Sequence, residues 1–170
     1  IYDQHIIEAM FDKLASGEIT DTLAINISPS SISEPSFIRW VTQLLTSNRR
    51  IAPLVHFEIP EICFIDTPHY SALFCNAIRT AGADYGVDNY GRHFQSLQYL
   101  NEYRPHYVKL DYLFTHYLDD DKQTNTLASI SRAAHNLGIT TVASRVETQE
   151  QLDFLSKHFI DVFQGFIVDK

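Results

Sequence analysis

The chain has 170 residues, of which 45% are hydrophobic and 20% charged, and its formal net charge is −8. This length and composition are typical of one soluble globular domain. The acidic balance argues against a general nucleic-acid binder, which needs a basic face, but not against a small anion bound at a site with its own cations. The two cysteines and eight histidines form no zinc-like or disulfide-like pattern, which favours a reducing compartment.

No apolar run reaches the roughly 18 residues of a membrane-spanning helix, and no signal peptide is visible. The chain starts inside a helical pattern and without an initiator methionine. We therefore expect residues 1–170 to form one partial domain of a longer protein.

Apolar residues alternate between helical and strand-like spacing along the chain. We expect helices at 6–14, 37–45, 70–81, 94–103, 127–137 and after the capping box of Thr148 and Gln151, and strands at 22–28, 51–58, 84–88, 107–110, 139–143 and 162–168. Six apolar strands that alternate with helices indicate a parallel sheet covered by helices.

Polar residues at the strand ends distinguish two folds that fit this count, a doubly wound open sheet and part of a (β/α)₈ barrel. Such residues lie at or near the end of every expected strand: Asn26, Glu58, Asp88, Lys109, Ser144 and Gln164. In a barrel all these ends form one rim, whereas in an open sheet only the strands beside the switch point meet. The pattern favours the barrel. No GxGxxG motif follows the first strand, so a dinucleotide-binding fold has no support.

Short motifs surround these strand ends. They read Asn26-Ile27-Ser28, Glu58-Ile59-Pro60-Glu61, Asp88-Asn89-Tyr90-Gly91, Lys109-Leu110-Asp111, Ser144-Arg145-Val146-Glu147-Thr148 and Gln164-Gly165-Phe166. In this order they resemble the NxS, ExxE, DDFG, KID, EGVET and QGY motifs of the EAL domains of bacterial cyclic-di-GMP signalling. The resemblance implies an α/β fold, a TIM-like (β/α)₈ barrel of the EAL type that is N-terminally truncated, with about six strands present.

The resemblance also implies what lies outside this chain. The strand that carries the family's Glu-Ala-Leu would precede Ile1. A barrel that lacks strands has open edges, which can pair with another chain. We therefore expect the fragment to associate through that gap or through a helix near it.

The resemblance implies a site for two divalent metals in active members, which hydrolyse cyclic-di-GMP with Mg²⁺ or Mn²⁺. Such ions prefer oxygen ligands and activate a water for attack on the phosphodiester. Asn26, Glu58 and Asp88 match the ligands of the first metal. Lys109 matches the group near the attacking water or the phosphate. Asp111 fits either a role at the site or the cap of a loop.

The site of the second metal lacks both of the carboxylate residues that the resemblance assigns to that metal alone. Asn89 stands in place of an Asp and Ser144 in place of a Glu, and neither brings a negative charge or can act unaided as a general base near neutral pH. Arg145 replaces a Gly and adds a positive charge. We therefore expect no catalytic residue, no second metal and no required cofactor, with at most one Mg²⁺ or Mn²⁺ at the first-metal position.

Binding the dinucleotide without hydrolysis needs shape, donors and stacking groups but no activated water. The residues that we expect to contact the ligand are Asn26, Glu58, Asp88, Arg92, Lys109, Arg145 and Gln164. The planar fork of an arginine suits both phosphates and guanine edges. The segment from Asn89 to Arg92, with 107–111 after it, is most similar to the degenerate EAL domains of LapD-type receptors.

Three functions stay open on the sequence alone: a catalytically inactive cyclic-di-GMP receptor, an active or residual phosphodiesterase that yields pGpG, and an interaction module without nucleotide binding. The resemblance favours the receptor. It further implies cyclic-di-GMP as ligand, a homodimer, a diguanylate cyclase as candidate partner, and a cytoplasmic location with an inner-membrane-anchored parent protein. We expect neither a nucleic-acid partner nor a membrane segment in the chain.

Overall fold

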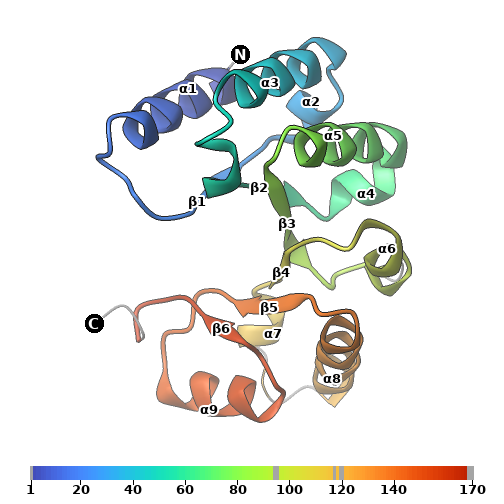
Figure 1. Ribbon diagram of the computed structural model, residues 1–170. Helices are drawn as coiled ribbons and strands as arrows, with labels where there is room; N and C mark the ends of the chain where they lie inside the picture. Colours follow the sequence, from blue (N-terminus) through green and yellow to red (C-terminus); the bar gives the residue numbers. More distant parts are fainter. Residues whose placement is uncertain (1, 94–95, 117, 119–120, 168–170) are drawn as a thin grey trace. The chain divides into compact units, whose positions relative to one another are not determined.

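The computed structural model describes residues 2–93, 96–116, 118 and 121–167, and helices alternate with strands along them (Figure 1). In chain order the elements are α1 (Tyr2–Ala15), β1 (Leu23–Asn26), α2 (Pro29–Ile32), α3 (Pro35–Ser47), the 3₁₀ turn η1 (Ala52–Leu54), β2 (Val55–Pro60), α4 (Ile62–Asp66), α5 (Pro68–Thr80), β3 (Asp84–Tyr90), α6 (Ser96–Tyr103), β4 (Tyr107–Leu110), α7 (Leu113–His116), α8 (Asp121–Asn136), β5 (Thr140–Ala143), α9 (Gln149–Lys157) and β6 (Val162–Phe163). None of the helices in these described ranges combines the length and apolar character that crossing a bilayer requires.

The order of the strands decides between the two folds considered above. All six belong to one sheet whose order follows the chain, β1-β2-β3-β4-β5-β6. The pairs β1–β2, β4–β5 and β5–β6 are parallel. A doubly wound sheet would reverse its strand order at an inner strand, whereas a barrel adds each strand beside the last. The sequential order therefore confirms the α/β class and the barrel-type topology.

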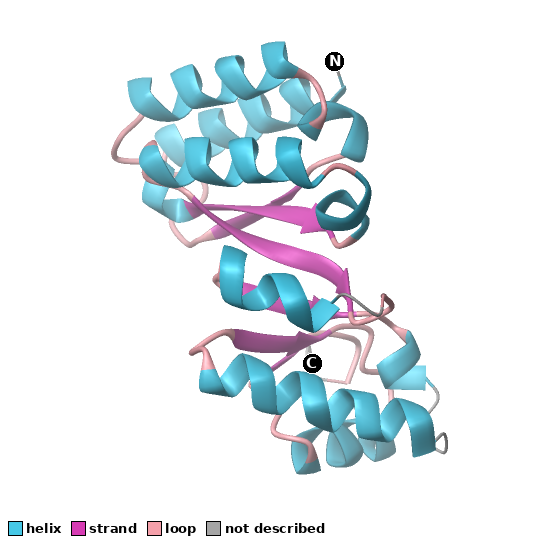
Figure 2. Cartoon of the chain, turned by 90° about the vertical axis from the view of Figure 1, so that its right-hand side faces the viewer, coloured by secondary structure: helices cyan, strands magenta, loops and turns pink. Residues whose placement is uncertain are grey.

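The chain divides into two compact units, residues 1–86 and 87–170, which meet within β3. In the first unit, α1, α3 and α5 lie together on one side of β1 and β2 (Figure 2). Its core contains three buried rings, with Phe74 of α5 stacked 6.2 Å from Phe37 of α3 and edge-on 5.7 Å from Phe57 of β2. These rings anchor two helices on the strand that carries Glu58.

In the second unit, β4 and β5 each alternate between buried and half-buried residues. Val108 and Leu110 are buried, and the apolar face of α8 packs toward β5 through buried residues such as Leu127 and Ala134. Successive strand residues point to opposite faces of a sheet. Lys109 therefore lies on the face opposite to this core.

Several element bounds differ from the expected ones. The second strand starts at Val55 rather than 51, because Ala52–Leu54 forms a 3₁₀ turn with Pro53 inside it. The last strand spans only Val162–Phe163 in the described residues, and residues 94, 95 and 168 lie outside them. The helices α2, α4 and α7 were not predicted, because four or five residues are too few to show a helical period.

A buried carboxylate connects α1 to the end of β1. Asp3 is 8% exposed, and its Oδ2 accepts hydrogen bonds from the Ser28 amide at 2.9 Å and the Ser28 hydroxyl at 2.7 Å. Ser28 in turn caps α2 by accepting from the Ser31 amide. Burial alone would raise the pKa of Asp3, but the hydrogen bonds from Ser28 and Ser31 outweigh it and hold that pKa below the ordinary 3.8.

We predict that Asp3→Ala lowers the free energy of unfolding by about 2 kcal/mol at pH 7, because Ser28 loses a charged acceptor. The folded pKa is depressed, so this stabilisation is fully present above pH 3.8 and is lost as the pH falls through the folded value. Urea unfolding of both proteins at pH 7 and at acid pH measures the effect.

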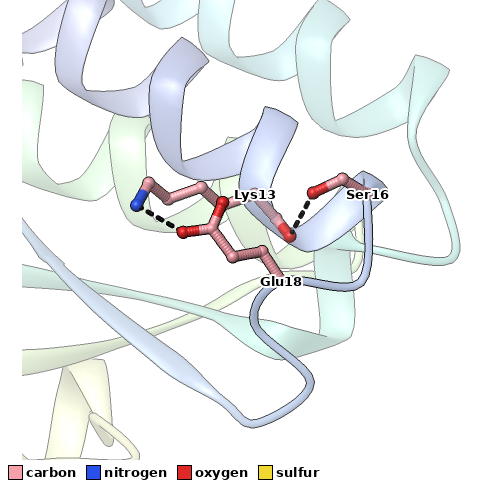
Figure 3. Close-up of polar contacts among 3 residues, drawn as sticks. All are labelled: Lys13, Ser16 and Glu18. Atoms are coloured by element: carbon pink, nitrogen blue, oxygen red, sulfur yellow. Dashed lines mark hydrogen bonds and ion pairs between the residues drawn. The ribbon is translucent and has the colours of Figure 1, made fainter.

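A matched control is the exposed pair at the end of the same helix, in which Lys13 Nζ lies 2.8 Å from Glu18 Oε1 (Figure 3). Its side chains are 42% and 61% exposed, so we expect Glu18→Gln to cost less than about 1 kcal/mol. A loss in Asp3→Ala that did not shrink in acid would show that the Asp3 charge is not what stabilises the fold.

Candidate functional site

Two of the predicted site residues lie side by side in the first unit. Asn26 at the end of β1 and Glu58 on β2 are register partners across the parallel pair, and the Ile27 amide donates to the Glu58 carbonyl at 3.0 Å. Asn26 is exposed, whereas Glu58 is only 3% exposed. The two strand ends thus bring an amide residue and a buried carboxylate residue side by side.

At the end of β3, Asn89 donates a hydrogen bond to its neighbour. The Asn89 side-chain amide lies 3.3 Å from Asp88 Oδ2, and its backbone is left-handed, with φ of 54°. Asparagine tolerates this conformation better than most residues. A second carboxylate at this place would repel Asp88 unless a cation lay between them. Asn89 instead gives Asp88 a neutral hydrogen-bond donor.

Asp111 holds the segments after β3 and β4 together. Its amide donates to the Tyr90 carbonyl at 3.0 Å, and its Oδ1 accepts from the Leu113 amide at 3.0 Å. Asp111 is 1% exposed, and its Oδ2 accepts no hydrogen bond among the described residues but lies 3.5 Å from Arg92 Nε. The hydrogen bond from the Leu113 amide shows the loop cap, which is one of the two roles open to Asp111. Its Oδ2 also fixes the place of Arg92, whose side chain stays 49% exposed.

The segment after β5 keeps a backbone shape that suits glycine. Arg145 has φ of 59° and is exposed, and its guanidinium lies 5.9 Å above the ring of Tyr112. Ser144 before it is half-buried, and its carbonyl accepts from the Thr115 hydroxyl at 3.2 Å. A cationic side chain therefore occupies a position at which the left-handed backbone normally favours Gly.

The last predicted site residue continues the pairing of β5 and β6. The backbone amide of Gln164 donates to the Ala143 carbonyl at 2.9 Å, and the backbone carbonyl of Gln164 accepts from the Val146 amide at 3.1 Å. The next residue, Gly165, has φ of 149°, and a Cβ there would lie 2.4 Å from the Val146 nitrogen. The sequence analysis assigned no separate role to Gly165. Its signal was a glycine directly after a strand-end polar residue.

Backbone hydrogen bonds thus bring the ends of β3, β4, β5 and β6 to one edge of the second unit. The predicted residues at this edge are Asp88, Arg92, Lys109, Arg145 and Gln164. Lys109 is half-buried and faces Val142 in register. Asn26 and Glu58 belong to the other unit. Within the described ranges, no three His, Cys, Asp or Glu side chains gather as a metal-binding group.

The edge can bind an anion more readily than it can assemble two cations. It carries two guanidinium groups, an ammonium group and an amide. Two carboxylates lie beside them, of which Asp88 is half-buried and Asp111 is buried next to Arg92. The two ions of a two-metal site lie roughly 3.5–4 Å apart. They need several negatively charged oxygens between and around them. Asn89 and Ser144, which the motif comparison matches to two of these oxygens, offer only an amide and a hydroxyl.

The sequence profile of the EAL domain family matches residues 2–170. Among curated relatives, the probable cyclic di-GMP phosphodiesterase PdeG of Escherichia coli is 30% identical over 146 residues, which are 85% of this chain and 29% of that protein. The chain therefore spans less than a third of that relative.

Solved structures give a nearer likeness. The S helix-GGDEF-EAL part of Vibrio cholerae LapD, bound to c-di-GMP, is 70% identical with a TM-score of 0.96, over 99% of this chain and 41% of that one. Klebsiella pneumoniae BlrP1 in a manganese and cyclic-di-GMP complex is 29% identical with a TM-score of 0.74, over 86% and 38% of the two chains. These likenesses confirm the predicted TIM-like (β/α)₈ fold of the EAL type, of which six strands are described here.

We predict that Gly165→Ala lowers the free energy of unfolding by about 2 kcal/mol or more, because the new methyl would collide with backbone atoms that cannot swing away. Gly138→Ala is the control, since its φ is also positive, at 68°, but no atom lies within 4 Å of the added Cβ. We expect about 1 kcal/mol there from the backbone alone. Equal losses in chemical denaturation would contradict the close approach of Gly165 to Val146.

Proposed function

Because the chain belongs to the EAL domain family, we propose that it binds cyclic-di-GMP as a receptor and does not hydrolyse it. The observation that carries the proposal is the pair Asn89 and Ser144, which stand where two acids of the second-metal site are expected. The hydrogen bond from Asn89 to Asp88 adds to it, because it directs a donor toward the remaining carboxylate. Hydrolysis by two metals needs negative oxygens at these places.

The donor chemistry of the retained motif residues favours one metal over a pair. By their match to the family's motifs, Asn26, Glu58 and Asp88 offer amide and carboxylate oxygens, which are donor types that suit Mg²⁺ or Mn²⁺. Such an ion would neutralise phosphate charge when bound. Asn89 and Ser144 do not fit a second ion, because neither carries a charge and the Asn89 amide already donates to Asp88. No cofactor is required for the receptor.

Cations at the edge of the second unit would hold the ligand's phosphates and bases. Arg92, Lys109, Arg145 and Gln164 supply the donors in this proposal. The ion pair with Asp111 restrains the Arg92 side chain. Less side-chain freedom is therefore lost when the guanidinium binds the ligand. The chain as a whole is acidic, so an anionic ligand depends on these local charges. The likeness to a LapD structure that carries c-di-GMP supports the same ligand.

The proposal also covers the oligomeric state, the partner and the location of the longer protein that contains this domain. We propose a homodimer that signals to a partner, with a diguanylate cyclase as the candidate, from the cytoplasmic side of an inner-membrane-anchored protein. These assignments rest on the resemblance to LapD-type receptors, and the 70% identity to the S helix-GGDEF-EAL part of LapD supports that resemblance.

A phosphodiesterase is the second candidate, because PdeG and other relatives carry that name and because Asn26, Glu58, Asp88 and Lys109 are all retained. If the chain is a phosphodiesterase, hydrolysis must proceed without acids at positions 89 and 144. If the chain is a receptor, Asn89 and Ser144 are the reason that hydrolysis is lost.

We predict that the 170-residue chain binds cyclic-di-GMP in titration calorimetry, and that Arg145→Gly weakens binding about tenfold through the loss of a charged donor. Glycine suits the left-handed backbone at 145, so the variant should stay folded. Arg50→Ala, which removes an exposed arginine from the other unit, serves as the charge control and should leave affinity unchanged. Absence of binding heat in the parent chain would favour an interaction module without nucleotide.

We predict that the full-length domain, with the strand that carries the Glu-Ala-Leu in place, releases no pGpG from cyclic-di-GMP with Mg²⁺ or Mn²⁺, as followed by chromatography. Turnover by that full-length domain would establish the phosphodiesterase instead, and the following double variant is made in the same domain. Asn89→Asp together with Ser144→Glu returns both acids, and Asp tolerates the left-handed backbone at position 89. Hydrolysis gained by this double variant would show that the two positions alone account for the loss.

A further inference from the structure

A cavity of about 350 Å³ lies between α8 and the end of α9. Ser131, Arg132 and His135 line it from α8, and Lys157, His158 and Phe159 line it from α9 and the residues after it. These segments lead into the amino ends of β5 and β6. The cavity is therefore at the opposite end of the strands from Ser144 and Gln164.

The walls of this cavity are basic although the chain is acidic. Arg132, His135 and Lys157 are exposed, and among the described residues neither Arg132 nor Lys157 forms an ion pair with a carboxylate. The Nδ1 of His158 lies 2.8 Å from the Phe154 carbonyl, which leaves Nε2 for another contact. Two permanent positive charges without acidic partners create a local site for an anion.

Helix ends explain only part of this cluster. His135 and Lys157 lie in the last turns of their helices, where a cation is favourable beside the negative end of the helix dipole. Such a role needs neither a cavity nor a buried donor. Two further residues of the cavity wall, Ser131 and Phe159, have features that the dipole does not explain.

The first is the hydroxyl of Ser131. Ser131 is 3% exposed, and its Oγ has no hydrogen-bond partner among the described residues. On the same helix, Thr126 and Ser129 donate to the carbonyls four residues earlier, at 2.9 Å each. A buried hydroxyl without a partner is costly. Ser131 lines the cavity, so a rotation of this side chain toward the cavity would let its hydroxyl donate to an acceptor bound there.

The second is the exposed ring of Phe159. This residue follows the C-cap of α9 with φ of 60° and is 80% exposed. The corresponding residue after α8 is Gly138, with φ of 68°, as helix ends usually require. Phe159 thus combines a strained backbone with an aromatic side chain held in water at the cavity wall. Strain of this kind clusters at ligand sites.

We propose that this cavity binds a phosphorylated aromatic small molecule of the nucleoside monophosphate class. The phosphate lies between Arg132 and Lys157 and accepts from the Ser131 hydroxyl, and the base stacks on Phe159. The volume of about 350 Å³ is near the lower end for small-molecule sites, which suits a mononucleotide rather than a cyclic dinucleotide. The inference does not rest on the proposed receptor function.

Titration calorimetry of the full 170-residue chain with AMP, inorganic phosphate and adenosine separates the contributions of the two ligand parts. We expect AMP to bind, and each fragment to bind at least about tenfold more weakly, because each makes only half of the contacts. Saturating cyclic-di-GMP should leave the AMP affinity unchanged, since the two sites lie at opposite strand ends. Phosphate that binds as tightly as AMP would overturn the nucleotide assignment.

Three variants assign the binding to this cavity. Ser131→Ala and the pair Arg132→Ala with Lys157→Ala should each weaken AMP about tenfold or more. Phe159→Gly should reduce AMP to the affinity of phosphate while the fold is retained, because glycine relieves the backbone at that position. Arg50→Ala is again the charge control. AMP binding that none of the three variants changes, or no AMP binding at millimolar concentration, would overturn the proposal.

Discussion

Parallel pairing of consecutive strands is the constraint on which the candidate site depends. Neighbouring strands of the parallel pairs β1–β2, β4–β5 and β5–β6 end at the same edge, so residues far apart in sequence come to one side within each unit. The register partners Asn26 and Glu58 show this directly. In the second unit the same effect is reinforced by backbone bonds that continue past the strands, from Asp111 to Tyr90 and from Val146 to Gln164.

The chemistry at this edge follows from charge rather than from shape. Asp88 remains, but its neighbour offers an N–H in place of a negative oxygen. The residue at 144 offers a hydroxyl, and the residue at 145 adds a guanidinium. Each of these changes makes the edge less able to hold a second cation and more able to hold an anion. A receptor needs the anion site alone, which is why the same fold can serve either purpose.

The strand ends could be predicted from sequence because each combines an apolar run with a polar terminus, and these patterns survive without any knowledge of tertiary contacts. The role of Asp111 could not be resolved in the same way, since Asp111 is only 1% exposed and no local pattern in the sequence reveals that burial. The left-handed backbone of Arg145 and the close approach of Gly165 to Val146 are also tertiary. The short helices α2, α4 and α7 were not predicted for a local reason, because they contain too few residues to show a helical repeat.

The main-chain conformation at positions 89 and 145 bears on how the family's two activities are related. Both residues adopt left-handed angles that Asp and Gly accept as well as, or better than, Asn and Arg do. Exchange at these positions therefore alters side-chain chemistry on an unchanged backbone. An enzyme and a sensor built on this fold would then be separated by a few single-residue steps that leave the main chain intact. Substitutions could therefore convert an enzyme into a sensor, or a sensor into an enzyme, through intermediate sequences that all still fold.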